Sequence, residues 1–214
     1  NATSEACDIA KFAQEIGANG ILSIAPYYNK PTQEGLYQHY KTIAQSVEIP
    51  FMLYNVPGRT GVDLLPETAI RLFDDVKNIY GIKEATGSLE RATAIISQRE
   101  NFFVFSGDDS VDFAMLASGA KGIISVTSNL VPNLKSKLVS SVMSGDFQTA
   151  LKIHNDLFEL NKVLFCESNP IPIKAAMYLS GLLDSLEFRL PLTKPSNETL
   201  EKLEKILKKY EVVK

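Results

Sequence analysis

Short apolar runs alternate with amphipathic segments through the first two thirds of the chain. Apolar runs bounded by turn residues are typical of buried strands, and apolar positions three and four residues apart are typical of helices. Five strands are predicted, at residues 20–26, 50–57, 78–85, 101–109 and 121–128. A helix is predicted after each of them, at residues 36–47, 66–73, 89–97, 110–117 and 132–143. Because the strands are apolar almost throughout, the pattern predicts an α/β protein whose parallel strands are covered on both faces.

The two ends of the chain read as helical. A first helix is predicted from the start, with Thr3 as its N-cap residue. Beyond Gly145 the strand pattern stops, and helices are predicted at residues 146–165, 170–180 and 196–210. We therefore expect two domains, βα units over residues 1–145 and a helical domain over residues 146–214.

Composition excludes several classes of function. The net charge is -3 and basic residues do not gather apart from acidic ones, so a nucleic-acid partner is not expected. No apolar run approaches the roughly 20 residues of a membrane helix, so no membrane partner is expected either. Two histidines cannot form a His-rich metal site, and no metal is expected. Cys7 and Cys166 match no metal or redox spacing, which favours reduced thiols and a cytoplasmic protein.

A lysine ends the third predicted strand, in the segment "GIKEAT". Active sites of parallel α/β barrels lie at the carboxyl ends of the strands. Apolar surroundings would lower the pKa of the Lys83 amine and make it a nucleophile toward a carbonyl group. The alternative is an ion pair with Glu84, or an ammonium that reaches solvent. Because neighbouring side chains alternate, Glu84 is expected on the opposite face of the sheet.

Other polar residues at the strand ends allow two interpretations each. Tyr54 could relay protons for an amine nucleophile, or it could be a core tyrosine with one hydrogen bond. Arg59, in the segment "GRTG", could bind a carboxylate, or it could be a solvated surface residue. Asp108 and Asp109 are interpreted first as helix caps and second as acid-base groups.

Six segments in order resemble one family. They are "PYYNKPTQEGLYQHY", "LYNVPGRTG", "GIKEATG", "SGDD", "GIISVTSN" and "FCESNPIPIK". Together they resemble the dihydrodipicolinate synthase family, which belongs to the pyruvate-dependent class I aldolases. The resemblance implies a (β/α)8 TIM barrel with a C-terminal helical extension, assembled as a homotetramer of two tight dimers. It also implies a lyase that condenses pyruvate with L-aspartate 4-semialdehyde in lysine and diaminopimelate biosynthesis.

The resemblance assigns roles to individual residues. Lys83 would form the Schiff base with pyruvate, and no other cofactor is implied. Tyr54 would relay protons, together with Tyr28 reaching across the tight-dimer interface. Arg59 would bind the carboxylate of the semialdehyde. The remaining matched positions line the pyruvate site, at Gly107 and Ile124, or an inhibitory L-lysine site, at Asn1, Ala2, Glu5 and Tyr27.

The start of the chain departs from the family pattern. "NATSEA" matches the segment that opens the helix after the third barrel strand, so about three strands and a threonine of the proton relay are expected to be absent. We therefore expect a fragment that is inactive alone. Two other readings stay open: a sister Schiff-base aldolase, such as N-acetylneuraminate lyase or a keto-deoxy sugar acid aldolase, and a non-catalytic lysine-binding module.

Overall fold

The computed structural model describes residues 1–210 of the chain. It divides into two compact units, Asn1–Ile124 and a second unit that begins at Ser125. The sequence instead predicts a domain boundary after residue 145. Helices α7 (Pro132–Met143) and α8 (Phe147–Asp156), which flank that predicted boundary, pack against each other within the second unit.

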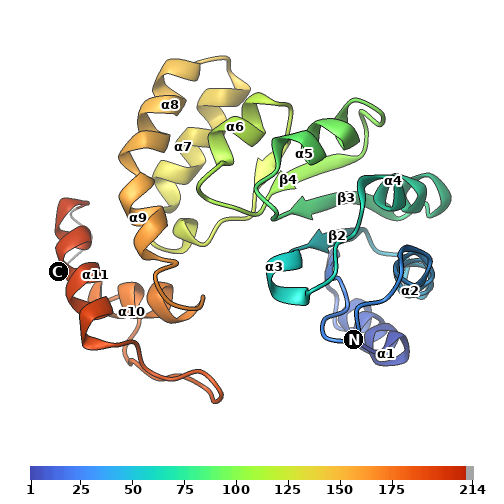
Figure 1. The fold of residues 1–214 in the computed structure, drawn as a ribbon, viewed down its shortest axis with the longest axis horizontal. Coiled ribbons are helices and arrows are strands. Elements are labelled where there is room, and N and C mark those ends of the chain that lie inside the picture. Colours follow the sequence, from blue (N-terminus) through green and yellow to red (C-terminus); the bar gives the residue numbers. More distant parts are fainter. Residues whose placement is uncertain (211–214) are drawn as a thin grey trace. The chain divides into compact units, whose positions relative to one another are not determined.

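The first unit is built on a parallel sheet whose strands follow the order of the chain (Figure 1). The strands are β1 (Ile21–Ile24), β2 (Phe51–Asn55), β3 (Ile79–Glu84), β4 (Phe103–Ser106) and β5 (Gly122–Ile123). Each pairs in parallel with the next. The predicted α/β class with a parallel sheet is therefore confirmed. β5 ends earlier than predicted, because the chain continues into a short 3-10 helix, η1 (Thr127–Asn129).

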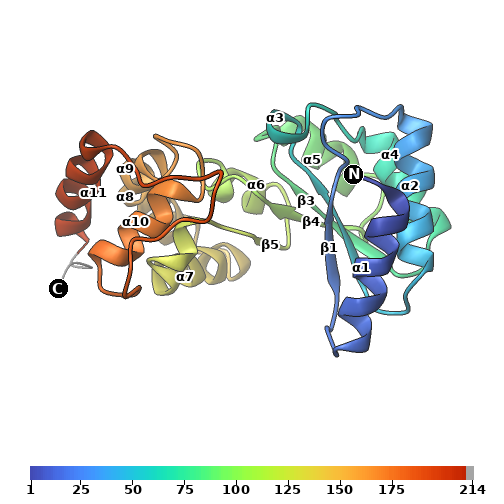
Figure 2. The ribbon, with the colours of Figure 1, turned by 90° about the horizontal axis from the view of Figure 1, so that it is seen from below.

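Helices of the first unit cover one face of the sheet (Figure 2). They are α1 (Thr3–Glu15), α2 (Gln33–Gln45), α4 (Pro66–Asp75), α5 (Leu89–Ile96) and α6 (Asp112–Ala117). A further short helix, α3 (Pro57–Thr60), follows β2. Successive helices of this layer lie beside one another because each βα unit adds one strand and one helix in the same direction.

The two faces of the sheet differ in burial. On the helix-covered face, the register partners Leu53, Ile82 and Val104 are at most 1% exposed. On the other face, Leu22 and Phe103 are 45% and 37% exposed. The expectation that both faces are covered is therefore wrong for this unit, because its helices lie on one face only. Replacing a fully buried core leucine such as Leu53 by alanine would cost about 2–5 kcal/mol.

Helix α1 begins one residue earlier than predicted. Ala2, not Thr3, is its N-cap residue, and no side chain caps it. The Thr3 hydroxyl instead lies 2.8 Å from Nδ1 of His39 on α2. The predicted Thr3 cap is wrong because this hydroxyl links two neighbouring helices.

In the described part of the second unit, helices joined by loops are the only secondary structure (Figure 1). It contains α7, α8, α9 (Phe158–Val163), α10 (Ile171–Leu179) and α11 (Asn197–Lys209). Helix α7 has the predicted bounds. The single helix predicted for residues 146–165 is two helices, separated at Leu157.

Candidate active site

Lys83 and Tyr54 lie side by side at the ends of adjacent strands. They are register partners of β3 and β2. Register partners in a parallel sheet direct their side chains to the same face. Lys83 Nζ lies 4.4 Å from the centre of the Tyr54 ring. The structure thus brings together the two residues that the sequence predicts as nucleophile and proton relay.

The surroundings of Lys83 favour its neutral amine. Burial lowers the pKa of Lys83, because the ammonium loses hydration. The charge of Asp109 acts in the opposite direction and raises this pKa, and the charge of Arg59 lowers it further. Asp109 is 2% exposed. The pKa of the nucleophile is therefore set by burial first and then by two opposite charges.

Tyr54 remains a protonated phenol at neutral pH. Burial raises its pKa, and the positive charge of Arg59 lowers the pKa by a smaller amount. Its backbone is fixed from the helix layer, where the hydroxyl of the fully buried Tyr40 donates to the Tyr54 carbonyl oxygen at 3.3 Å. A protonated phenol beside an amine can donate a proton to a departing hydroxyl group.

Arg59 lies on the short helix α3, in a segment that the sequence analysis treats as a loop. Pro57 begins this helix and Gly61, with φ at +74°, ends it. The Arg59 side chain is exposed, yet its charge acts on both Lys83 and Tyr54. Helix α3 thus places a cation near the amine and the phenol.

Gly107 follows β4 and lies directly against Lys83. A Cβ atom at this position would be 2.8 Å from Lys83 Cε and 2.7 Å from Ala85 Cβ. No real Cβ atom tolerates such contacts without a shift, so only glycine fits here. Ile124 is fixed after β5 by the hydrogen bond from its N–H to the Ser106 carbonyl oxygen, 2.8 Å.

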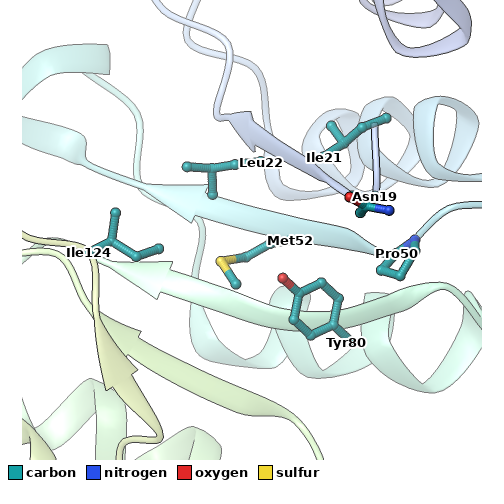
Figure 3. A pocket seen from close by; sticks show the side chains of 8 residues that line it. Asn19, Ile21, Leu22, Pro50, Met52, Tyr80 and Ile124 are labelled. Atoms are coloured by element: carbon teal, nitrogen blue, oxygen red, sulfur yellow. The ribbon is translucent and has the colours of Figure 1, made fainter. Parts of the chain in front are cut away.

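A hollow of about 610 Å³ opens on the same uncovered face of the sheet. Figure 3 shows Leu22 of β1, Met52 of β2 and Ile124, which follows β5, among the side chains that line it. Tyr80 closes another side. Lys83, Tyr54 and Arg59 are not among its lining residues. Of the residues assigned to the substrate site, its lining includes Ile124 alone.

The residues assigned to an inhibitory site form a loose group near the start of the chain. Asn1 Nδ2 donates to the Tyr27 carbonyl oxygen at 3.4 Å. Glu5 is exposed in the first turn of α1, one turn after Ala2. Tyr28 is 88% exposed and has φ at +75°, in the left-handed region that a bulky residue rarely adopts. Asn1 and Tyr27 are in contact, and Tyr28 extends into solvent.

Sequence reasoning missed two features of the site. Asp108 does not cap α6, whose N-cap residue is Val111; it accepts a hydrogen bond from the Ser110 N–H at 3.0 Å. The helix-capping prediction is therefore wrong for Asp108 and for Asp109, because neither is the N-cap residue. The second is a buried polar network around Glu84. The sequence predicts only that the Glu84 side chain points to the opposite face of the sheet from Lys83. The alternation prediction itself is confirmed, because Glu84 is fully buried and pairs with Arg91 of the helix layer.

The described residues contain neither a cluster of metal ligands nor a membrane-spanning helix. Within residues 1–210, no group of three or more His, Cys, Asp or Glu side chains is arranged to hold a metal ion. None of the helices in that same range has the length and apolar character needed to cross a membrane.

Consecutive parallel βα units with a lysine and a tyrosine at neighbouring strand ends define an α/β enzyme. The profile of the Dihydrodipicolinate synthetase family matches residues 1–210. The chain belongs to this family.

Individual relatives agree with this assignment. The 4-hydroxy-tetrahydrodipicolinate synthase of Aliarcobacter butzleri is 85% identical over 214 residues, which are 100% of this chain and 72% of that protein. The crystal structure of dihydrodipicolinate synthase from Aquifex aeolicus matches with a TM-score of 0.97 and 47% identity, over 100% of this chain and 73% of that one. The chain therefore spans about 72% of the length of this curated relative.

Two further solved structures hold small molecules. Dihydrodipicolinate synthase from Acinetobacter baumannii, complexed with pyruvate, is 46% identical with a TM-score of 0.95, over 99% of this chain and 72% of that chain. The enzyme from Cyanidioschyzon merolae, with lysine bound, is 35% identical with a TM-score of 0.95, over 99% of this chain and 72% of that chain. The fold class predicted from the sequence agrees with all of these matches.

Proposed function

We propose that the protein is a lyase that carries out the 4-hydroxy-tetrahydrodipicolinate synthase reaction, the condensation of pyruvate with L-aspartate 4-semialdehyde. The observation that carries this proposal is the Lys83 amine, whose pKa is lowered by burial and which lies 4.4 Å from the Tyr54 ring centre. The family assignment and the named relatives support the same reaction.

The first chemical step forms an imine. The neutral Lys83 amine attacks the keto carbon of pyruvate, and the resulting hydroxyl group leaves as water after it takes a proton. In this proposal Tyr54, whose ring lies beside the amine, donates this proton and accepts one later. The protonated imine withdraws electrons, so the methyl group of pyruvate loses a proton and becomes an enamine. The enamine carbon then attacks the aldehyde carbon of the second substrate.

Three other residues bind the substrates in this proposal. Arg59 binds the semialdehyde carboxylate, because a guanidinium can donate two parallel hydrogen bonds to it. Gly107 lines the pyruvate site, and its lack of a side chain leaves room for the Lys83 side chain itself, since a Cβ atom there would lie 2.8 Å from Lys83 Cε. Ile124 contributes an apolar wall. No cofactor beyond the covalent imine is needed for this chemistry.

The assembly and regulation are also proposals. The exposed, left-handed Tyr28 is suited to reach a second subunit in a tight dimer, and two such dimers would form a homotetramer. Asn1, Ala2, Glu5 and Tyr27 would contribute one side of an L-lysine site at that interface. Cys7 and Cys166 are free thiols, which suits a cytoplasmic enzyme.

A direct assay tests the proposed reaction against the sister aldolases. The purified full-length protein, as it occurs in the cell, is supplied with pyruvate and either L-aspartate 4-semialdehyde or N-acetylmannosamine, and consumption of pyruvate is followed. We expect turnover with the semialdehyde only. Consumption of pyruvate with N-acetylmannosamine, without condensation of the semialdehyde, would overturn the assignment.

Replacing Tyr54 by phenylalanine removes the phenol and keeps the ring beside Lys83. We expect kcat to fall by about 10²- to 10⁴-fold, the usual contribution of general acid–base catalysis. Folding should be unaffected, because the ring and its packing remain. Steady-state kinetics and circular dichroism of the Y54F variant measure both effects. A kcat close to that of the unmodified protein would show that another group moves the proton.

Removing a positive charge and removing a negative charge near Lys83 should shift the pH profile of imine formation in opposite directions. Arg59→Gln removes a charge that lowers the pKa of Lys83, so this pKa rises and less neutral amine is present at pH 7. The acid limb of imine formation then moves to higher pH. Asp109→Asn removes a charge that raises the same pKa, so its acid limb moves to lower pH.

The measurement is the initial rate of borohydride-dependent pyruvate incorporation from pH 5 to pH 10. Arg59→Gln should also raise KM for the semialdehyde by about tenfold or more, through loss of a charged hydrogen bond. Shifts in the same direction for both variants would contradict this account of the site.

A further inference from the structure

A buried polar row lies directly behind the candidate active site. Tyr54 and Lys83 are register partners on one face, and the next pair along the same strands is Asn55 and Glu84. Because side chains alternate along a strand, this second pair faces the helix layer. Asn55 and Glu84 are both 0% exposed. A carboxylate buried to this extent is tolerated only when it is paired and hydrogen-bonded.

Glu84 meets that condition with both of its oxygens. Oε1 accepts the backbone N–H of Thr86 at 3.0 Å. Oε2 accepts Nε of Arg91 at 3.3 Å and Nδ2 of Asn55 at 3.4 Å. The last residue of β3 is therefore tied to β2, to α5 and to the turn that follows it.

Arg91 and Asn55 extend the same network to the segment that follows α3. Arg91 donates to Asp63 Oδ2 at 3.0 Å and to the Leu64 carbonyl oxygen at 2.6 Å. Asn55 Nδ2 donates to Asp63 Oδ1 at 2.9 Å, and Asn55 Oδ1 accepts the Leu64 N–H at 3.0 Å. This segment begins just after the helix that carries Arg59. The Arg91 guanidinium thus joins α5, β3 and the Asp63–Leu64 segment. The Arg91 side chain is only 15% exposed.

We propose that Asn55, Asp63, Glu84 and Arg91 form a positioning network for the catalytic face of the sheet. None of these four residues touches the reacting atoms. Asn55 directly follows Tyr54 in the chain, and Glu84 directly follows Lys83. A rotation of the backbone at Asn55 or Glu84 would therefore also turn the catalytic side chain before it. The network holds the amine and the phenol at their separation, and it holds the Arg59 helix beside them. The proposal rests on the proposed function of Lys83 and Tyr54.

The energetics favour a role in positioning over a role in stability alone. A buried ion pair contributes little net stability, because desolvation of both charges offsets their attraction. Reactive groups, in contrast, must be held closely, and a misplacement of about 1 Å can reduce the rate by about 10²-fold. A network that joins β2, β3, α5 and the Asp63 segment supplies such precision.

Arg91→Lys and Glu84→Gln are the test variants. Lysine keeps the charge of Arg91 but lacks the planar fork that bonds Glu84, Asp63 and the Leu64 carbonyl oxygen together. The matched control is Arg99→Lys, which breaks a similar two-pronged contact to Asp74, at 2.7 Å for each bond, on the exposed surface. For each variant we measure kcat, KM for pyruvate, the pH profile of imine trapping and the fraction of trappable sites.

We expect kcat per trapped site to fall by about 10- to 100-fold in R91K and E84Q, with a smaller change in KM and an altered pH profile of trapping. The R99K control should match the unmodified protein. A purely structural role would instead lower the thermal midpoint and the number of trapped sites, and would leave kcat per site and the pH profile unchanged. That result overturns the positioning proposal.

Two further results have a defined interpretation: a variant that does not fold, and an unmodified protein that shows no activity. If R91K does not fold, Asp63→Asn, which keeps the size of the side chain and weakens one arm, is measured in the same way and decides the question. If the unmodified protein neither traps pyruvate nor turns over, the proposed function itself fails. If it does both, and the network variants behave like R99K, only the positioning proposal fails.

Discussion

Replacing Lys83 by alanine should abolish turnover, with a loss on the order of 10³- to 10⁶-fold. The amine is the only nucleophile that the proposed mechanism uses, and no neighbouring group replaces it. Alanine at this position keeps the strand, because the side chain lies on the uncovered face of the sheet. Borohydride reduction in the presence of pyruvate should attach one reduced pyruvate to the unmodified protein and none to K83A. Peptide mapping should place the adduct on residue 83.

An exposed lysine provides the control for this experiment. Lys77 precedes the same strand and is solvent-exposed. Lys77→Ala should retain both the adduct and the turnover, since Lys77 precedes β3 and lies at the opposite end of this strand from the Lys83–Tyr54 pair. An adduct that persists in K83A, or one that maps to a different lysine, would refute the assignment of the nucleophile.

Replacing Gly107 by alanine should reduce kcat by about 10²-fold without removing any catalytic group. The new methyl group would stand 2.8 Å from Lys83 Cε, and it would stand 2.7 Å from Ala85 Cβ. The lysine side chain can turn aside, but the contact with Ala85 Cβ is relieved only by a shift of the backbone at Gly107 or after β3, and both changes displace the amine. Steady-state kinetics should show the loss, and the rate of borohydride trapping should fall in parallel.

Gly58→Ala is the matched control. Gly58 lies on α3, and a Cβ atom there would meet nothing within 4 Å. Its variant should keep kcat close to that of the unmodified protein and gain slightly in helix propensity. If G107A and G58A have equal activity, the close contact at Gly107 does not control the position of Lys83.

The strands and their ends could be predicted from the sequence because they depend on local patterns of apolar and polar residues. Apolar runs predict β1 to β5, and polar residues after each run predict the edge at which Lys83 and Tyr54 meet. The short helix α3 was not predicted, since the four residues Pro57–Thr60 are too few for a helical period to be visible. The Thr3 and Asp108 caps failed for a related reason. A hydroxyl or carboxylate near a helix start predicts a cap, but tertiary neighbours decide which hydrogen bond it makes.

By itself the sequence determined the order of strands and helices, the family, and the identity of the candidate nucleophile, phenol and guanidinium. These follow from periodicity and from motifs, which are properties of short segments. Only the tertiary structure decided the register that pairs Tyr54 with Lys83, the contact of Gly107 with Lys83, and the network of Glu84, Arg91 and Asp63. Those features join residues that are distant along the chain. They exist only after the strands have packed side by side and the helices have covered one face of the sheet.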